Sequence, residues 1–336
     1  MKNKIFNIAV VILSSVMLTY FFLYKNGFNQ LVSVIKIINI WWLLVGIVLM
    51  LIYWFFETLI IHELTRLLFL KQNYKKSMKA AMVGQLFGAI TPLQTGAQPA
   101  IFYALMDSGV DSGSATSILM MKFIVHQTIL TVYSFIIIVL KFNYFKSMVS
   151  YLSYLCLLGF LFNSGIILVA IMFSVNKNFT KSILIGILKL LKKIKLVKAV
   201  EKSEIKIENS LNNFHTNAAL IAKNYKVVMK VAIINTIQLT VFYVIPYCIY
   251  RSFNLQSASL WNMLAAQTLV MMIVSITPLP GGSGGAEGGF TLLFKIFFKE
   301  NILPAVLLWR IITYYSCIGI GLLFSIHLPR NKIRSN

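Results

Sequence analysis

Charged residues are scarce in this sequence. Asp, Glu, Lys and Arg make up only 12% of its 336 residues, whereas hydrophobic residues make up 58%. A soluble domain usually carries about 25% charged residues. This shortage, with a mean hydropathy of +0.80, excludes an ordinary soluble globular domain. Because helices satisfy their own backbone in lipid, we expect an all-α polytopic membrane protein.

Acidic residues are scarcer still, since 9 Asp and Glu stand against 31 Lys and Arg and give a net charge of +22. In a soluble protein this balance would suggest nucleic acid as a partner. Here the basic residues gather near the N-terminus and in 62–79, 174–230 and 327–336. This asymmetry follows the positive-inside rule. It predicts a multi-pass membrane protein with both termini in the cytoplasm, and no nucleic-acid partner.

Cysteine and histidine are also rare, with 3 and 4 residues respectively. Cys156, Cys248 and Cys317 all fall inside apolar runs, which excludes a disulfide framework and any metal-ligand spacing. No Ser/His/Asp or Cys/His arrangement stands out. We therefore predict no metal, no cofactor and no assigned catalytic residue, although an enzyme stays open.

Long hydrophobic runs are what the sequence has in abundance. A membrane-crossing helix needs roughly 20 apolar residues, and about six runs qualify. They are 5–24, 40–61, 114–140, 148–173, 228–250 and 302–326. The first run ends without a small-residue cleavage site, so we expect a retained helix and not a signal peptide.

Two further apolar segments are interrupted. Residues 80–107 break at Thr91-Pro92, and residues 260–298 break at Thr277-Pro278. Non-helical backbone at membrane depth must be buried in protein or line a cavity, so each segment is expected to form a re-entrant or broken-helix hairpin. Counting spans makes the two hairpins enter from opposite sides, which is typical of inverted-repeat carriers.

These patterns predict one transmembrane domain, 1–336, built as an inverted repeat. Half one is 30–173 and half two is 228–336. The Lys-rich linker 174–227 between them has apolar residues at helical spacing. It is expected to form amphipathic cytoplasmic helices that bind anionic lipid headgroups, or simply a positive-inside connection.

The second break is rich in glycine, with Gly281, Gly282, Gly284 and Gly285 close together. Glycine lets successive backbone amides converge on an anion such as a phosphate. The alternative is close helix packing by small residues. Glu287 follows within this tip, and a charge in the membrane normally has a partner or a task.

Arg310 interrupts the last apolar run and is the natural partner of Glu287, as a structural ion pair or as part of a substrate site. Lys122 and His126 are spaced i,i+4 and share one helix face. Lys122 could meet a lipid phosphate or snorkel to the interface. Glu57 and His126 are expected to balance charge.

At the two breaks the sequence resembles the transmembrane, flippase-like domain of the lysylphosphatidylglycerol synthase family. This family includes the multiple peptide resistance proteins and the stand-alone UPF0104 proteins. The resemblance lies in Thr91-Pro92 with Gly96-Ala97-Gln98-Pro99 and in the stretch from Thr277 to Glu287. It implies phospholipid translocation in the bacterial plasma membrane and a role in antimicrobial peptide resistance. Because the sequence ends at Asn336, we expect no aminoacyl transferase domain and a separate lipid synthase as a partner.

The leading hypothesis is a lipid flippase or scramblase for a phospholipid such as phosphatidylglycerol or its lysyl derivative, with the acyl chains left in bulk lipid. The alternatives are a lipid-headgroup-modifying enzyme, such as a phosphatidylglycerol lysyltransferase, and a small-solute carrier. The expected substrate-binding residues are Thr91, Pro92, Gly96, Gln98, Lys122, Thr277, Pro278, Gly281, Gly282, Gly284, Gly285, Glu287 and Arg310.

Overall fold

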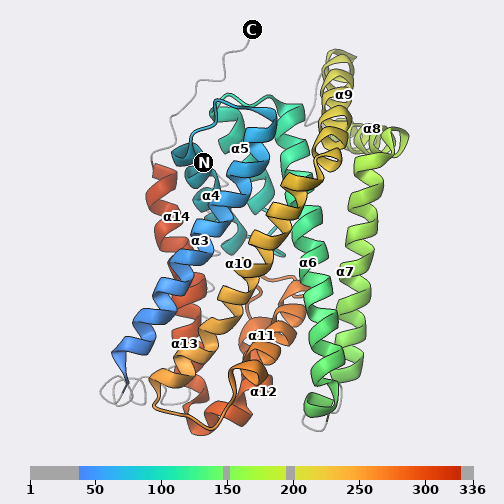
Figure 1. Cartoon of the computed structure of the whole chain (residues 1–336). Coiled ribbons are helices and arrows are strands. Elements are labelled where there is room, and N and C mark those ends of the chain that lie inside the picture. The colour runs from blue at the N-terminus through green and yellow to red at the C-terminus, as the bar shows by residue number, and fades with distance from the viewer. Residues whose placement is uncertain (1–37, 147–151, 194–200, 327–336) are drawn as a thin grey trace.

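A computed structural model of the chain describes residues 38–146, 152–193 and 201–326. These ranges are helical and contain no strand beyond an isolated antiparallel bridge between Pro92 and Pro280 (Figure 1). The helices are α3 (Ile40–Leu68), α4 (Tyr74–Ala89), α5 (Ala97–Asp107), α6 (Ser112–Lys146), α7 (Leu152–Val175), α8 (Lys177–Lys193), α9 (Glu201–Lys223), α10 (Tyr225–Ser252), α11 (Leu260–Ser275), α12 (Gly285–Phe298), η1 (Lys299–Asn301), α13 (Ile302–Arg310), η2 (Ile311–Tyr315) and α14 (Ser316–Ile326).

Five helical stretches of the described chain are long and apolar enough to cross a membrane. They are Ile40–Leu68, Ser112–Lys141, Leu158–Val175, Tyr225–Ser252 and Gly285–Ser325. They correspond to five of the six predicted runs; the remaining run, 5–24, lies outside the described residues. The last stretch joins α12 to the final span although the chain turns between them, at η1, where Lys299 has a φ of 49°.

Polar caps set where several of these helices begin. Asn39 and Asn73 each accept a hydrogen bond at 3.1 Å from the amide two residues further on, at the starts of α3 and α4. Asn224 caps α10 and Ser259 caps α11 by accepting from the amide three residues further on, at 3.4 Å and 3.3 Å. A side-chain oxygen at this position satisfies an amide that has no partner within the helix.

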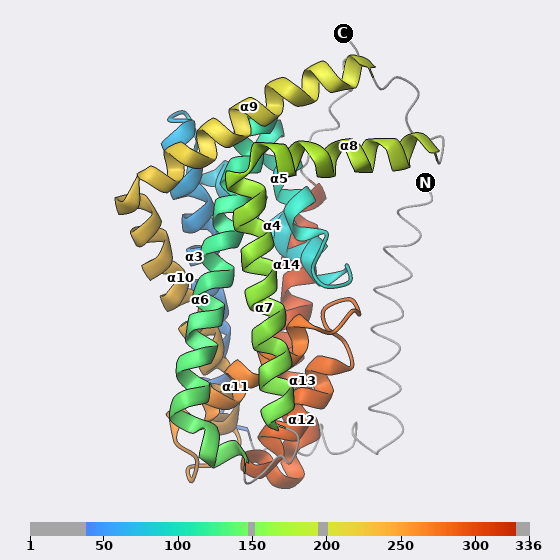
Figure 2. The same ribbon diagram turned by 90° about the vertical axis from the view of Figure 1, so that its right-hand side faces the viewer.

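Two helical hairpins form the centre of the bundle. Helices α4 and α5 lie toward the end that carries α8 and α9, whereas α11 and α12 lie toward the opposite end (Figure 2). Their connecting loops approach one another near mid-height, where Pro92 bridges Pro280. We call residues 91–96 the first tip and residues 277–284 the second tip. The opposed entry expected from the span count is thus observed.

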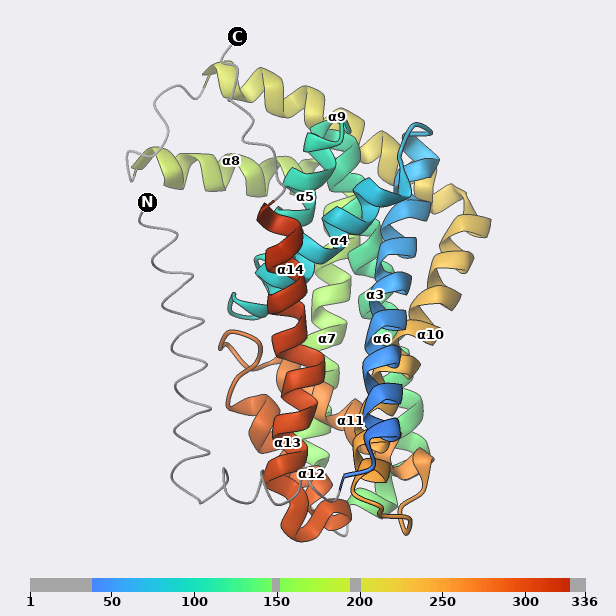
Figure 3. The same ribbon diagram turned by 90° about the vertical axis from the view of Figure 1, so that its left-hand side faces the viewer.

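The predicted amphipathic linker forms two helices, α8 and α9, across one end of the bundle (Figure 3). An exposed ion pair joins them, with Lys181 Nζ 3.2 Å from a Glu208 carboxylate oxygen. α9 also packs against α6, where the buried Ser117 hydroxyl donates to the Phe214 carbonyl at 2.9 Å. The linker is therefore a fixed part of the fold over its described residues.

The hydrophobic core lies where α10, α11 and α12 meet the last span. Its largest fully buried side chains include Tyr243, Tyr250, Phe290 and Phe294. Phe290 stacks on Trp309 with ring centroids 4.7 Å apart. α3 packs along α10, so the first spans of the two proposed halves lie side by side. This rigid frame holds the second tip in place.

Candidate functional site

The first tip is closed by Thr91. Its hydroxyl donates to the Phe87 carbonyl at 2.5 Å and accepts from the Gly96 amide at 2.8 Å. These bonds satisfy backbone groups that the broken helix leaves without partners. A Cβ on Gly96 would lie 2.7 Å from Thr91 Cγ2, so only glycine allows the return helix α5 to begin against this threonine.

The second tip repeats this arrangement over a longer loop. The Thr277 hydroxyl donates to the Ile273 carbonyl at 2.8 Å, and a Cβ on Gly285 would lie 2.0 Å from Thr277 Oγ1. In both hairpins a threonine before a proline therefore packs against the glycine that starts or caps the return helix.

Glycine is required elsewhere in the second tip for two reasons. Gly281, Gly282 and Gly284 have φ values of 58°, 64° and 82°, which L side chains rarely adopt. A Cβ on Gly281 would also lie 2.1 Å from a Tyr314 ring carbon. Close packing, the alternative explanation of the glycines, therefore accounts for part of the pattern.

Three amides of the second tip are already occupied within the tip. The amide of Gly282 donates to Leu279 at 2.9 Å, that of Ser283 to Pro280 at 3.1 Å, and that of Gly284 to Glu287 Oε2 at 2.7 Å. In this conformation they do not converge on a vacant anion site. Only the Gly284 amide binds a negative charge, and that charge belongs to the chain itself.

Glu287 and Arg310 form a buried ion pair, as their sequence context suggested. Arg310 Nε lies 2.7 Å from Glu287 Oε1, and the two side chains are 4% and 13% exposed. Arg310 also donates to the Gly281 carbonyl at 3.1 Å. Glu287 stands in the first turn of α12, where the helix dipole favours a negative charge. The pair thus ties the last span to the second tip.

Tyr314 completes this group, although the sequence alone does not single it out. Its ring centroid lies 4.5 Å from the Arg310 guanidinium carbon, and its hydroxyl oxygen is buried with no hydrogen-bond partner in the described chain. The i,i+4 spacing from Arg310 is the signal that could have indicated it. Arg310 directly precedes the π-helical segment η2 and Tyr314 lies within it, and such segments are frequent at functional sites.

A second buried polar cluster links α3, α6 and α10. Lys122 Nζ lies 2.7 Å from Glu57 Oε1, and Gln238 donates to Glu57 Oε2 at 3.0 Å. Asn235 contacts both Gln238, at 2.9 Å, and His126 Nδ1, at 3.1 Å. Glu57 is thus paired with Lys122, and His126 joins the cluster through Asn235. Asn235 and Gln238 were not predicted.

The structure divides the predicted site residues among three places. Most of them lie in the two tips and the Glu287–Arg310 pair. Lys122 instead belongs to the Glu57 cluster, where its ammonium is paired with a carboxylate. Gln98 lines a cavity between α5, α6 and α7. The described residues include no group of three or more His, Cys, Asp or Glu placed to hold a metal ion.

Long apolar helices, opposed hairpins and a buried ion pair where the hairpins meet define a multi-pass membrane protein with an interrupted, polar centre. The sequence comparisons agree with this class. Residues 5–321 match the model of the family described as the lysylphosphatidylglycerol synthase TM region, and the chain belongs to that family. It is also 26% identical over 298 residues to a UPF0104 membrane protein of Archaeoglobus fulgidus, covering 86% of this chain and 87% of that protein.

Proposed function

We propose that this protein is a lipid translocase, of flippase or scramblase type, that moves a phospholipid such as phosphatidylglycerol or lysylphosphatidylglycerol between leaflets. The observation that carries the proposal is the buried Glu287–Arg310 pair at the place where two opposed hairpins touch. Discontinuous helices that meet between two repeats are the usual frame of alternating-access carriers. The family, whose description refers to lysylphosphatidylglycerol synthases, makes a phospholipid the favoured substrate.

Headgroup binding would proceed by exchange of anions at Arg310. A lipid phosphate that displaces the Glu287 carboxylate would accept hydrogen bonds from Arg310 Nε and from the Gly284 amide, the two donors that Glu287 now occupies. Arginine suits this role because its planar fork matches phosphate oxygens. The displaced Glu287 carboxylate would then accept a hydrogen bond from the ammonium of a lysyl headgroup.

The inverted repeat is part of this proposal. It is supported by the opposed hairpins and by the threonine–glycine contact that both tips share, Thr91 with Gly96 and Thr277 with Gly285. Two equivalent halves that rock about their meeting tips would expose the Glu287–Arg310 pair to each side in turn.

The linker helices are proposed to bind anionic headgroups on the face that the positive-inside rule assigns to the cytoplasm. α8 lies across the end of the bundle and not along it (Figure 2), as expected of a helix in the interfacial plane. A separate lipid synthase, acting at the same membrane surface, would supply an aminoacylated substrate.

A fluorescent-lipid translocation assay in proteoliposomes tests the proposal. Arg310→Ala or Glu287→Ala should lower the rate about tenfold to a hundredfold, the effect expected for loss of a hydrogen bond to a charged group. Glu208→Ala is the matched control, because Glu208 belongs to an ion pair with side chains 45% and 54% exposed. It should leave the rate within about twofold of the unchanged protein.

Three results would contradict the proposal. Full translocation by both Arg310→Ala and Glu287→Ala would show that this ion pair is not the substrate site. A new lipid headgroup, seen by mass spectrometry after expression, would favour a headgroup-modifying enzyme such as a lysyltransferase. Uptake of a soluble substrate, with lipid movement at background, would favour a small-solute carrier.

A further inference from the structure

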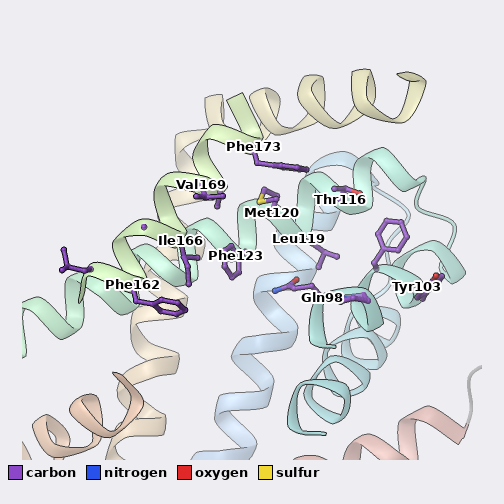
Figure 4. Close-up of a pocket in the computed structure, with 15 residues that line it drawn as sticks. Gln98, Tyr103, Thr116, Leu119, Met120, Phe123, Phe162, Ile166, Val169 and Phe173 are labelled. Atoms are coloured by element: carbon purple, nitrogen blue, oxygen red, sulfur yellow. The ribbon is translucent and has the colours of Figure 1, made fainter. Parts of the chain in front are cut away.

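A cavity of about 980 Å³ opens between α5, α6 and α7 (Figure 4). Its volume is at the upper end of the roughly 300–1,000 Å³ typical of small-molecule sites. The side chains that project into it are mainly apolar and include Phe102, Leu119, Phe123, Ile166, Val169 and Phe173. None of the lining residues is charged.

The position of the cavity decides what can fill it. α6 and α7 both contain candidate membrane spans, so hydrocarbon surrounds this part of the bundle. At the rim, Tyr103, Phe162 and Val169 are 71%, 43% and 56% exposed. A concave apolar site that opens toward hydrocarbon fits a lipid acyl chain better than a charged or strongly hydrated ligand.

Gln98 is one of three residues in the lining with a polar side-chain group, the others being Tyr103 and Thr116. Its Oε1 atom is buried and has no hydrogen-bond partner in the described chain. Burying an acceptor without a donor is unfavourable, so a ligand that supplies a donor here would be favoured. Gln98 lies in the first turn of α5, two residues after Gly96, which closes the first tip. The cavity therefore adjoins the tip that contacts the second hairpin.

We propose that this cavity binds an acyl chain of the transported phospholipid, and that Gln98 Oε1 accepts a hydrogen bond from a hydroxyl or ammonium group of the lipid headgroup. This differs from the expectation that the acyl chains remain in bulk lipid. This proposal rests on the proposed function only where it takes the bound lipid to be the transported one. Binding of lipid in the cavity is measured without translocation.

Gly165 provides the test variant. It lines the cavity, and a Cβ added there would meet nothing within 4 Å, so a leucine fills the cavity without a backbone clash. The probe is phosphatidylglycerol with a photoactivatable diazirine in one acyl chain, incorporated into vesicles with the full chain. After irradiation, mass spectrometry should find label on α5, α6 and α7 at the cavity. Gly165→Leu should lower it about tenfold, since apolar contacts of a few carbons discriminate by such factors.

Gly319→Leu is the matched control. Gly319 is also a glycine of an apolar helix whose added Cβ meets nothing within 4 Å, but it lies on α14, away from the cavity lining. Labelling should stay within about twofold of the unchanged protein, because no cavity contact is altered.

Gln98→Leu tests the hydrogen bond and keeps the side chain's approximate size. It should lower cavity labelling by phosphatidylglycerol about fivefold, the effect of one net hydrogen bond. The same probe built on phosphatidylcholine, whose headgroup has no donor, should be unaffected by the substitution. An equal loss with both probes would overturn the role of Gln98.

Undiminished cavity labelling in Gly165→Leu would overturn the cavity proposal, as would a lack of label on the cavity residues of α5, α6 and α7 in the unchanged protein. Loss of label in Gly165→Leu supports the cavity site whatever the translocation rate. Failure of this proposal is thus distinguishable from failure of the proposed function, which is read from Arg310 and Glu287.

Discussion

Glycines in and just after the second tip differ in what surrounds them. Gly281 has a φ of 58°, and a Cβ there would lie 2.1 Å from the ring of Tyr314, the residue that stacks on Arg310. Gly288 lies four residues beyond Gly284, inside α12, and a Cβ there would meet nothing within 4 Å. Only the first position therefore couples the tip backbone to the ion pair.

Alanine at these two positions is therefore expected to change the free energy of unfolding in different ways. Gly281→Ala should lower the free energy of unfolding by about 1–3 kcal/mol, because the methyl group overpacks against Tyr314. Gly288→Ala should leave it unchanged or raise it by up to about 1 kcal/mol, since alanine favours helix. Denaturant unfolding in detergent, followed by circular dichroism, measures both. Equal stabilities of the two variants would contradict the assigned packing.

At the scale of elements, the Glu57 cluster joins three helices that the sequence separates widely. Glu57 lies on α3, Lys122 on α6 and Gln238 on α10, and both contacts to Glu57 are largely buried. A buried ion pair adds little net stability, but removal of one partner leaves a charge without compensation. The cluster therefore makes the association of α3, α6 and α10 specific.

Glu57→Gln should lower the free energy of unfolding by about 3–5 kcal/mol, because Lys122 then keeps a buried, unpaired charge. The double variant Glu57→Gln/Lys122→Met should recover most of this loss. Glu63→Gln is the control on the same helix: its partner Lys230 is 54% exposed, and such pairs contribute about 0–1 kcal/mol. A double variant as unstable as Glu57→Gln alone would contradict the pairing.

Across the whole molecule, the two hairpins come from opposite ends and touch at Pro92 and Pro280. Alternating access requires such tips to change their relative position. Facing residues of an antiparallel bridge have Cα atoms about 4.5–5.5 Å apart, and this range suits a disulfide. The contact can therefore be locked covalently.

Oxidised Pro92→Cys/Pro280→Cys, in a background without the native cysteines, should translocate lipid only at the background rate, and a reductant should restore activity. The single variants Pro92→Cys and Pro280→Cys control for loss of each proline and should not respond to the oxidant. Undiminished translocation by the cross-linked protein would show that the tips need not separate.

Much of this organisation can be predicted from residues that are close in the chain. Apolar runs of membrane length, the threonine-proline breaks and the Lys-rich linker are local patterns, and the described helices follow them closely. The opposed entry of the hairpins then follows from counting spans. Arg310 and Glu287 are isolated charges in largely apolar segments. Because a charge in the membrane needs a partner, even their pairing could be predicted.

Other features depended on contacts between distant segments. Gln238 meets Glu57 across 181 positions, and Cys317 lies 3.7 Å from Gln85 across 232. No periodicity encodes such pairs, because helix packing and not sequence spacing brings them together. The sequence by itself determined that the protein lies in a membrane, where its spans run and where the two hairpins break. Only tertiary packing decided that Lys122 pairs with Glu57, that the tip amides bind within the tip, and that Gln98 faces an apolar cavity.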